Sequence, residues 1–302
     1  MQTIHSACSA SNLPPGGPVF SPVAAGLWRL HDWNFSTAEL ANWIEHAIQL
    51  GITTFDHADL YGGFRCEALF GQWLKANPGQ REHIQLVSKC GIKPADASRG
   101  WQVKHYDSSR AHILASVDAS LQNLGTDYLD LLLIHRPDPL MNPDEVADTF
   151  ASLRQSGKVR HFGVSNFSPS QFALLSSRTV LLTNQVEASL LHTAPLFDGR
   201  FDQCLQAGIR PMVWSPLAGG RLLQTDARTQ LHATLLRIAS ELGVSPATLA
   251  LAWLLRHPAR PIPISGSRRL ASLDEAAAAC RLQLDRQHWF ALLEAAHGQP
   301  VA

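Results

Sequence analysis

The chain has 302 residues, of which 45% are hydrophobic, so it is long enough to bury a large core. Its 25 basic and 25 acidic side chains balance, and the sequence contains no basic stripe or long run of like charges. This composition argues against nucleic acid or an anionic membrane as a partner and favours small molecules or other proteins. The sequence does not indicate an oligomeric state.

The cysteines indicate the compartment. They are scattered, odd in number and without the CxxC spacing of metal sites, which is typical of reduced thiols in a cytoplasm; they are Cys8, Cys66, Cys90, Cys204 and Cys280. Residues 1–18 lack a basic segment followed by an apolar one, so we interpret them as a flexible N-terminal leader rather than a signal peptide. No window reaches the roughly 20 apolar residues of a membrane helix. The folded domain is expected at 19–302.

Strands and helices alternate after the leader. A short strand is predicted at 19–27, and the next helix starts at a capping box formed by Ser36 and Glu39. Gly51 ends this helix before a strand at 52–55. Further strands are predicted at 84–89, 128–135, 159–165, 181–186, 210–215 and 261–264. Further helices are predicted at 66–76, 109–124, 143–155, 168–176, 201–207, 229–242 and 246–256.

This alternation predicts an α/β fold. Eight short, largely apolar strands separated by helices indicate βαβ units and a parallel sheet. The alternative is an open doubly wound sheet, but the first turn, at 26–30, lacks the GxGxxG pattern of that fold. We therefore predict a single-domain (β/α)8 TIM barrel, with 270–279 and 286–296 as extra C-terminal helices.

Polar side chains follow three successive predicted strands. Asp56 and Tyr61 follow the strand at 52–55, Lys89 ends the next strand, and His135 ends the apolar strand after it. The active site of a TIM barrel lies at the carboxyl ends of its strands, and successive strands lie side by side. These four side chains are therefore expected to converge.

The four side chains suit proton transfer. A tyrosine titrates near pH ~10 in water, and the ammonium of Lys89 is expected to favour the Tyr61 anion and bring its pKa nearer neutral. Asp56 is expected to keep the lysine protonated, and His135 to orient a carbonyl oxygen. Taken singly, each residue also has a structural interpretation as a cap, a packing group or a solvated strand end. This interpretation is weakest for His135, since an imidazole that closes an apolar strand needs a partner or a cavity.

Later strand ends are polar as well. Segments 163–167, 184–187 and 214–217 contain amides that can pair with a carboxamide and an indole that can stack on a flat ring. Segment 265–269 combines glycine, hydroxyls and two arginines at a helix start, which favours anion binding. The structural alternative for each segment is ordinary capping of a strand or helix end.

Together these motifs resemble the aldo/keto reductases. The matching segments are 56–62, 87–91, 121–137, 157–167 and 214–217. The run at 131–167 is especially similar to a bacterial branch of uncharacterised oxidoreductases. The resemblance covers nearly everything from Val19 onward. It implies a (β/α)8 barrel that binds NADP(H) in extended form without a Rossmann domain.

The resemblance also implies roles for individual residues. The catalytic tetrad would be Asp56, Tyr61, Lys89 and His135, with Tyr61 as the general acid. The nicotinamide and its carboxamide would be met by Ser165, Asn166, Gln185 and Trp214. The pyrophosphate would be met by Ser215 and Leu217, and the 2′-phosphate by Gly266, Ser267, Arg268 and Arg269. No metal is implied.

The expected reaction is reversible hydride transfer between the nicotinamide C4 and the carbonyl of an aldehyde or ketone. The two arginines Arg268 and Arg269 favour NADPH over NADH. The sequence departs from the family at Ser272, where an adenine-stacking arginine is common, and at Ala276, where an asparagine or glutamate is expected.

The substrate is less readable than the reaction. Trp28 and Trp101 are expected to line an aromatic substrate region, with Trp101 equally suited to packing within its loop. Two other functions remain open. One is a cofactor-sensing protein with little turnover, and the other is a metal-dependent hydrolase that uses His57, Asp59 and His135, against which the cation of Lys89 argues.

Overall fold

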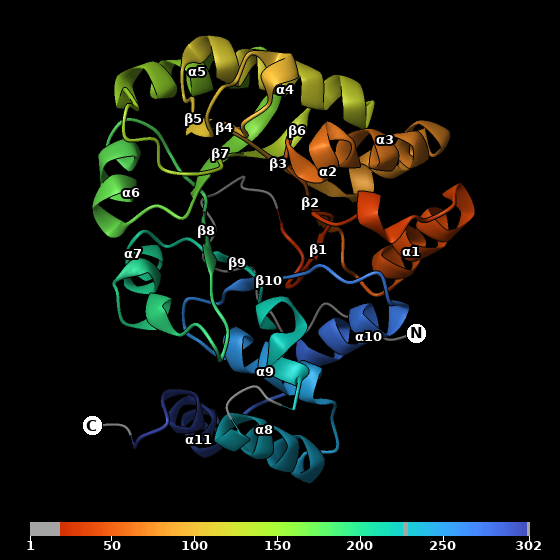
Figure 1. Cartoon of the computed structure of the whole chain (residues 1–302), viewed down its shortest axis with the longest axis vertical. Helices are drawn as coiled ribbons and strands as arrows, with labels where there is room; N and C mark the ends of the chain where they lie inside the picture. Colours follow the sequence, from red (N-terminus) through yellow and green to blue (C-terminus); the bar gives the residue numbers. More distant parts are fainter. Residues whose placement is uncertain (1–18, 226–228, 301–302) are drawn as a thin grey trace.

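A closed parallel barrel organises the chain (Figure 1). The computed structural model describes residues 19–225 and 229–300, and the predicted leader at 1–18 lies outside them. Eight strands hydrogen-bond in the order β1-β10-β9-β8-β7-β6-β3-β2, which confirms the predicted TIM barrel. They are β1 Ala24–Gly26, β2 Thr54–Asp56, β3 Gln85–Cys90, β6 Leu129–Ile134, β7 Val159–Ser165, β8 Asn184–Glu187, β9 Met212–Trp214 and β10 Ile262–Ser265.

Helices surround this barrel (Figure 1). The outer layer contains α1 Thr37–Gln49, α3 Cys66–Ala76, α4 Arg110–Leu124, α5 Pro143–Gln155, α6 Pro169–Ser176, α7 Arg200–Gln206, α9 Pro246–Leu255 and α10 Leu270–Ala279. Two further helices, α8 Thr229–Glu241 and α11 Arg286–His297, lie together outside α9. The capping box predicted for α1 is present, because Ser36 Oγ caps the Glu39 amide and the Glu39 carboxylate accepts from the Ser36 amide.

Within the described ranges, no single helix is both long and apolar enough to cross a bilayer. The pair Gln230–Glu241 and Pro246–Leu255 reaches the required length and apolarity only when joined, and it is bent by 94°.

The strand predicted at 19–27 is shorter in the structure and begins at Ala24. Ser21 explains the difference, because it pairs with Thr54 through side chains rather than through a strand ladder. The Ser21 amide donates to Thr54 Oγ1 at 2.9 Å, and the Thr54 amide donates to Ser21 Oγ at 3.1 Å. Likewise, β8 begins at Asn184 rather than at 181, and Thr183 just before it donates through Oγ1 to the Arg210 carbonyl.

Several short elements were not predicted. The loop after β3 contains an antiparallel pair, β4 Ile92–Lys93 and β5 His105–Tyr106. A single helical turn, α2 Tyr61–Phe64, follows β2. Elements this short show no periodicity of apolar residues, so the sequence pattern cannot reveal them.

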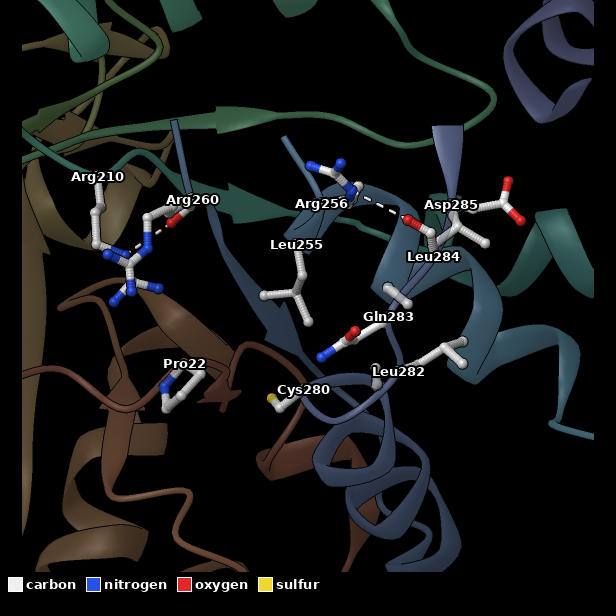
Figure 2. A pocket seen from close by; sticks show the side chains of 12 residues that line it. Pro22, Arg210, Leu255, Arg256, Arg260, Cys280, Leu282, Gln283, Leu284 and Asp285 are labelled. Atoms are coloured by element: carbon white, nitrogen blue, oxygen red, sulfur yellow. Dashed lines mark hydrogen bonds between the residues drawn. The ribbon is translucent and has the colours of Figure 1, made fainter. Parts of the chain in front are cut away.

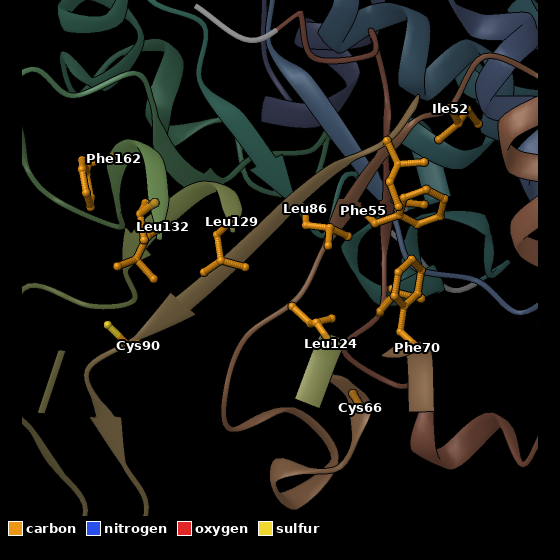
Figure 3. Packing of buried hydrophobic residues seen from close by; sticks show 14 of the residues in the cluster. Ile52, Phe55, Cys66, Phe70, Leu86, Cys90, Leu124, Leu129, Leu132 and Phe162 are labelled. Carbon is orange, nitrogen blue, oxygen red and sulfur yellow. The ribbon is translucent and has the colours of Figure 1, made fainter. Parts of the chain in front are cut away.

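Apolar side chains form one layer inside the barrel and a second layer between the strands and the surrounding helices. Val87, Leu131 and Leu133 lie inside the barrel in one cluster. Leu132 on β6 belongs to the outer cluster, in which strand side chains pack against helices such as α3 with its Phe70 (Figure 3). Burial on both faces explains why five of the six residues of β6 are apolar, as is typical of parallel sheets, and the exception is Asp130 near the start of the strand.

Gly71 sets the close approach of α3 to α4 and gives a first prediction. A Cβ at Gly71 would lie 2.0 Å from the Asn123 carbonyl oxygen and 2.9 Å from Leu124 Cα, so backbone would have to move. Although alanine favours helix by about 1 kcal/mol over glycine, we expect Gly71→Ala to lower the free energy of unfolding by about 1–3 kcal/mol. Urea unfolding followed by circular dichroism measures this.

The matched control is Gly79→Ala, because no heavy atom of the described chain lies within 4 Å of a Cβ built there. Its stability should stay within about 0.5 kcal/mol of the parent. Equal stabilities of the two variants would show that the α3–α4 contact is not limiting.

Candidate active site

Lys89 is the centre of the polar cluster at the carboxyl ends of the strands. Its side chain is fully buried. The ammonium donates to Asp56 Oδ2 at 2.8 Å, to the His57 carbonyl at 2.7 Å and to Tyr61 Oη at 3.1 Å, which satisfies all three of its protons. Burial lowers the pKa of Lys89, but the Asp56 carboxylate and Tyr61 outweigh this and raise the pKa above its usual value. The predicted effect of Asp56 on the lysine is confirmed.

Tyr61 lies on the turn α2, where Gly62 and Gly63 have φ values of 58° and 63° that favour glycine. Burial raises the pKa of Tyr61, and the nearby Lys89 only partly offsets it. The expectation of a pKa nearer neutral is therefore wrong in direction, because desolvation of the phenolate outweighs the attraction of one ammonium. The phenol stays protonated at neutral pH and is available as a proton donor.

His135 follows β6 and stands edge-on to Tyr61, with ring centres 5.8 Å apart. Its side chain is buried, and burial, then the charge of Lys89, lower the pKa of His135 well below its usual value. A neutral imidazole at this position can donate one hydrogen bond and accept another. The structure thus brings Asp56, Tyr61, Lys89 and His135 together.

A chain of hydrogen bonds connects this cluster to the ends of β7, β8 and β9. Gln185 Nε2 donates to Asp56 Oδ1 at 2.8 Å, so the carboxylate is held from two sides. Ser165 Oγ donates to the Gln185 carbonyl at 3.0 Å, and Asn166 Nδ2 donates to Ser165 Oγ at 2.7 Å. Trp214 Nε1 donates to Asn166 Oδ1 at 3.1 Å. The four residues predicted to meet the nicotinamide are therefore contiguous.

The loop after β9 contains Ser215 and Leu217, the residues predicted to meet the pyrophosphate. Ser215 has a φ of 52°, and Ala218, Gly219 and Gly220 also have positive φ values of 50°, 68° and 95°. Four residues in the left-handed region make this loop tightly turned and hold it beside Trp214.

The segment after β10 contains the residues predicted to meet the 2′-phosphate. Trp43 Nε1 of α1 donates to the Ser267 carbonyl at 3.1 Å and anchors the segment. Gly266, Arg268 and Arg269 are exposed. The two positions that depart from the family face the core of α10, since Ser272 is 7% exposed and Ala276 is fully buried.

The two tryptophans predicted to contact substrate differ in their surroundings. Trp28 follows β1 and is 58% exposed. Trp101 lies between β4 and β5, where its ring packs 6.1 Å from Phe64 and 5.4 Å from the guanidinium of Arg99. The packing interpretation therefore applies to Trp101, and contact of either tryptophan with a substrate stays a prediction.

A cavity of about 600 Å³ lies at the opposite end of the barrel (Figure 2). Its lining includes Pro22, Arg210 and Arg260, which precede β1, β9 and β10, so the cavity is at the amino ends of these strands. It contains none of the predicted site residues. This cavity is therefore separate from the polar cluster at the carboxyl ends of the strands.

Sequence reasoning did not identify Arg136 as a site residue. Its guanidinium carbon lies 5.6 Å from the centre of the Trp214 ring. Its position directly after His135 was the only available signal. Sequence reasoning also missed the bond from Gln185 to Asp56, because it joins β8 to β2 across the barrel.

The fold and the tetrad define a class of TIM-barrel enzyme with tyrosine, lysine, aspartate and histidine at the strand ends. The model of the Aldo/keto reductase family matches residues 22–296, and the chain belongs to this family. It is 51% identical over 292 residues to Oxidoreductase YdhF of Escherichia coli, which covers 96% of this chain and 98% of the relative.

Two further comparisons support the family. The chain is 46% identical over 286 residues to a 6-dehydroglucose reductase of Agrobacterium fabrum, covering 93% and 96% of the two chains. A crystal structure of an aldo/keto reductase from Klebsiella pneumoniae, in complex with NADP and acetate, is 25% identical and superimposes with a TM-score of 0.77 over 93% of each chain. The protein is therefore an oxidoreductase of the aldo/keto reductase family.

Behind the tetrad lie buried polar residues of the same segment. Asp59 is 8% exposed, and burial, then the nearby Glu67, raise its pKa to about 7. His57 is fully buried with its ring edge-on to Phe70 at 4.8 Å, and burial, then Lys89, lower its pKa to about 3. His57 therefore belongs to the packing between β2 and α3.

Asp59 makes the stability depend on pH. An unfolded chain loses the Asp59 proton near pH ~4, whereas the folded chain holds it to about 7. The folded state binds more protons between these values, so its stability falls as the pH rises through this window. The side chain in Asp59→Asn cannot ionise. As the pH rises, the free energy of unfolding of this variant should therefore fall less steeply than that of the parent, by up to about 1.4 kcal/mol per pH unit.

Urea unfolding at intervals across this window measures the difference. Asp127→Asn, at an exposed aspartate, controls for the loss of one carboxylate. Parallel pH curves for Asp59→Asn and the parent would show that Asp59 does not hold its proton in the folded state.

Proposed function

We propose that this protein reduces an aldehyde or ketone to an alcohol with NADPH as hydride donor and Tyr61 as general acid. The observation that carries the proposal is the position of Tyr61 Oη, 3.1 Å from the buried ammonium of Lys89 and edge-on to His135. A phenol with a raised pKa keeps its proton until the substrate accepts it. The cation beside it stabilises the phenolate that forms when the proton moves to a developing alkoxide.

The residues at the later strand ends fit a nicotinamide cofactor. The indole of Trp214 is half-buried and offers a flat face, and Asn166 beside it offers amide donor and acceptor atoms. Arg268 and Arg269 offer guanidinium groups to a phosphate. When bound, the cofactor would supply a hydride to the carbonyl carbon.

The residues of this chain then handle the proton. Tyr61 Oη–H donates its proton to the carbonyl oxygen as the hydride arrives at carbon, and the resulting phenolate is stabilised by the Lys89 ammonium. Asp56 balances the ammonium, and Gln185 holds the second oxygen of Asp56 in place. His135, neutral at pH 7, donates a hydrogen bond to the same carbonyl oxygen. Solvent returns the proton to Tyr61 after release of the alcohol.

Tyr61→Phe tests this role. It keeps the ring but removes the proton donor, so we expect kcat/KM to fall by at least about 100-fold on any accepted carbonyl, while the Kd for NADPH changes less than about threefold. NADPH oxidation followed by absorbance, and cofactor binding followed by fluorescence quenching, measure the two quantities.

Tyr128→Phe is the matched control, because Tyr128 lies at the amino end of the barrel, with its ring between the guanidinium groups of Arg81 and Arg160. Near-normal turnover by Tyr61→Phe would rule out Tyr61 as the acid. If the parent binds NADPH but oxidises none over a broad carbonyl panel, a cofactor-sensing protein becomes the better account.

We further propose a preference for NADPH over NADH, supported by the exposed Arg268 and Arg269 after β10. Replacing both arginines with alanine should raise KM for NADPH by about tenfold or more, since one charge-assisted contact contributes about 1.5–3 kcal/mol. The KM for NADH should stay nearly unchanged. Arg286→Ala, at another exposed arginine, is the control. An equal rise in KM for both cofactors would contradict a 2′-phosphate role.

The substrate panel should include sugar aldehydes, because relatives that are 46% and 40% identical are named 6-dehydroglucose reductase. Aromatic aldehydes should be included because Trp28 and Trp101 are the proposed substrate contacts. A cytoplasmic location fits the thiols Cys66, Cys90 and Cys204, which are buried and form no disulfide.

A further inference from the structure

Arg136 extends over the open end of the barrel. It follows His135, beyond the last residue of β6, and is half-buried. Its guanidinium carbon nevertheless lies 5.6 Å from the ring of Trp214, which ends β9. Two strands, β7 and β8, separate β6 from β9 in the barrel order. The guanidinium therefore points inward across the strand ends and does not face solvent on the outside of the barrel.

The charge of Arg136 acts on the reacting groups. Burial, then Lys89, then Arg136 lower the pKa of His135. Burial raises the pKa of Tyr61, and the charge of Arg136 acts in the opposite direction and lowers it. The exposed Lys104, from the connection between β4 and β5, adds to the effect on His135. Cations thus approach the proposed carbonyl site from two different loops.

The neighbouring carboxylates have other partners. Asp56 is bound by Lys89 and Gln185. Asp138, which follows Arg136 closely in sequence, accepts from both the amide and the hydroxyl of Ser108.

Two further acids lie near the strand ends. Asp107 in the loop after β5 pairs with Lys93. Glu187, the half-buried acid at the end of β8, lies in register with Trp214. Within residues 19–225 and 229–300, none of these acids forms an ion pair with Arg136.

From this geometry we infer that Arg136 is a specificity-determining residue that binds an anionic group, such as a carboxylate, carried by the carbonyl substrate. This inference rests on the proposed carbonyl reduction. A guanidinium pairs with a carboxylate through two parallel hydrogen bonds, and the pairing strengthens where water is partly excluded. Because Arg136 adjoins His135, the anionic group and the reacting carbonyl belong to one small molecule.

Two substrates that differ only in charge test the inference. 4-Carboxybenzaldehyde and its methyl ester share the ring and the aldehyde, so the ratio of their kcat/KM values reports recognition of the anion. We expect the parent to favour the carboxylate by about tenfold or more, which corresponds to about 1.4 kcal/mol. Added salt should raise KM for the carboxylate more than for the ester, since a partly exposed pair is screened.

Three variants locate the effect. Arg136→Gln should reduce the carboxylate-to-ester ratio by about tenfold, mainly through KM, and Arg136→Lys should restore part of it because the charge remains. Arg154→Gln is the matched control, since the Arg154 guanidinium lies 5.3 Å from the Phe162 ring and α5 places it near the amino ends of the strands. It should keep the parent ratio. Circular dichroism confirms folding of each variant.

Three results would overturn the inference. The first is an unchanged ratio in Arg136→Gln. The second is a higher Kd for NADPH with an unchanged ratio, which would assign Arg136 to the cofactor. The third is a loss of kcat/KM in Arg136→Gln that is as large for neutral glyceraldehyde as for the carboxylate substrate, which would assign Arg136 to the binding of hydroxyl groups. If the parent reduces neither these aldehydes nor any other carbonyl, the proposed function fails, and this inference fails with it.

Discussion

The buried ammonium of Lys89 is the interaction on which the site depends. An isolated ammonium inside a protein costs several kcal/mol of desolvation, so it persists only with its protons satisfied and its charge balanced. Asp56 balances the charge, and the His57 carbonyl and Tyr61 Oη complete its hydrogen bonds. Gln185 on β8 then holds Asp56 from across the barrel. One charge therefore fixes the relative positions of β2, α2, β3 and β8.

The two ends of the barrel use charge differently. At the amino end, Arg81 donates to Asp130 Oδ2 at 2.8 Å, while Arg160 contacts the other oxygen of Asp130, and both arginines flank the Tyr128 ring. The Asp130 carboxylate forms ion pairs with both arginines, which connects the start of β6 to the segment before β3 and to β7. At the carboxyl end, Arg136 has no such carboxylate partner among the described residues. TIM barrels commonly separate stability and chemistry in this way.

Much of the fold could be predicted because local signals agree with tertiary packing. Helix α5 and strand β7 begin and end at the predicted residues, since Asn142 caps the helix before Pro143, and Gly157 with a positive φ turns the chain into the strand. The tetrad was also predictable, because strand order places three successive strand ends side by side. The single turn α2 and the pair β4 and β5 were not, since two to four residues carry no pattern.

By itself, the sequence determined the alternation of strands and helices, the barrel and the end of each strand to within one residue, because these depend on apolar periodicity and local caps. Only the tertiary structure decided the electrostatics. The pKa of Tyr61 rises because the surrounding protein desolvates its hydroxyl more than Lys89 attracts its anion. The contacts of Gln185 with Asp56 and of Arg136 with Trp214 arise only on closure of the barrel, which brings residues far apart in sequence within reach of one another.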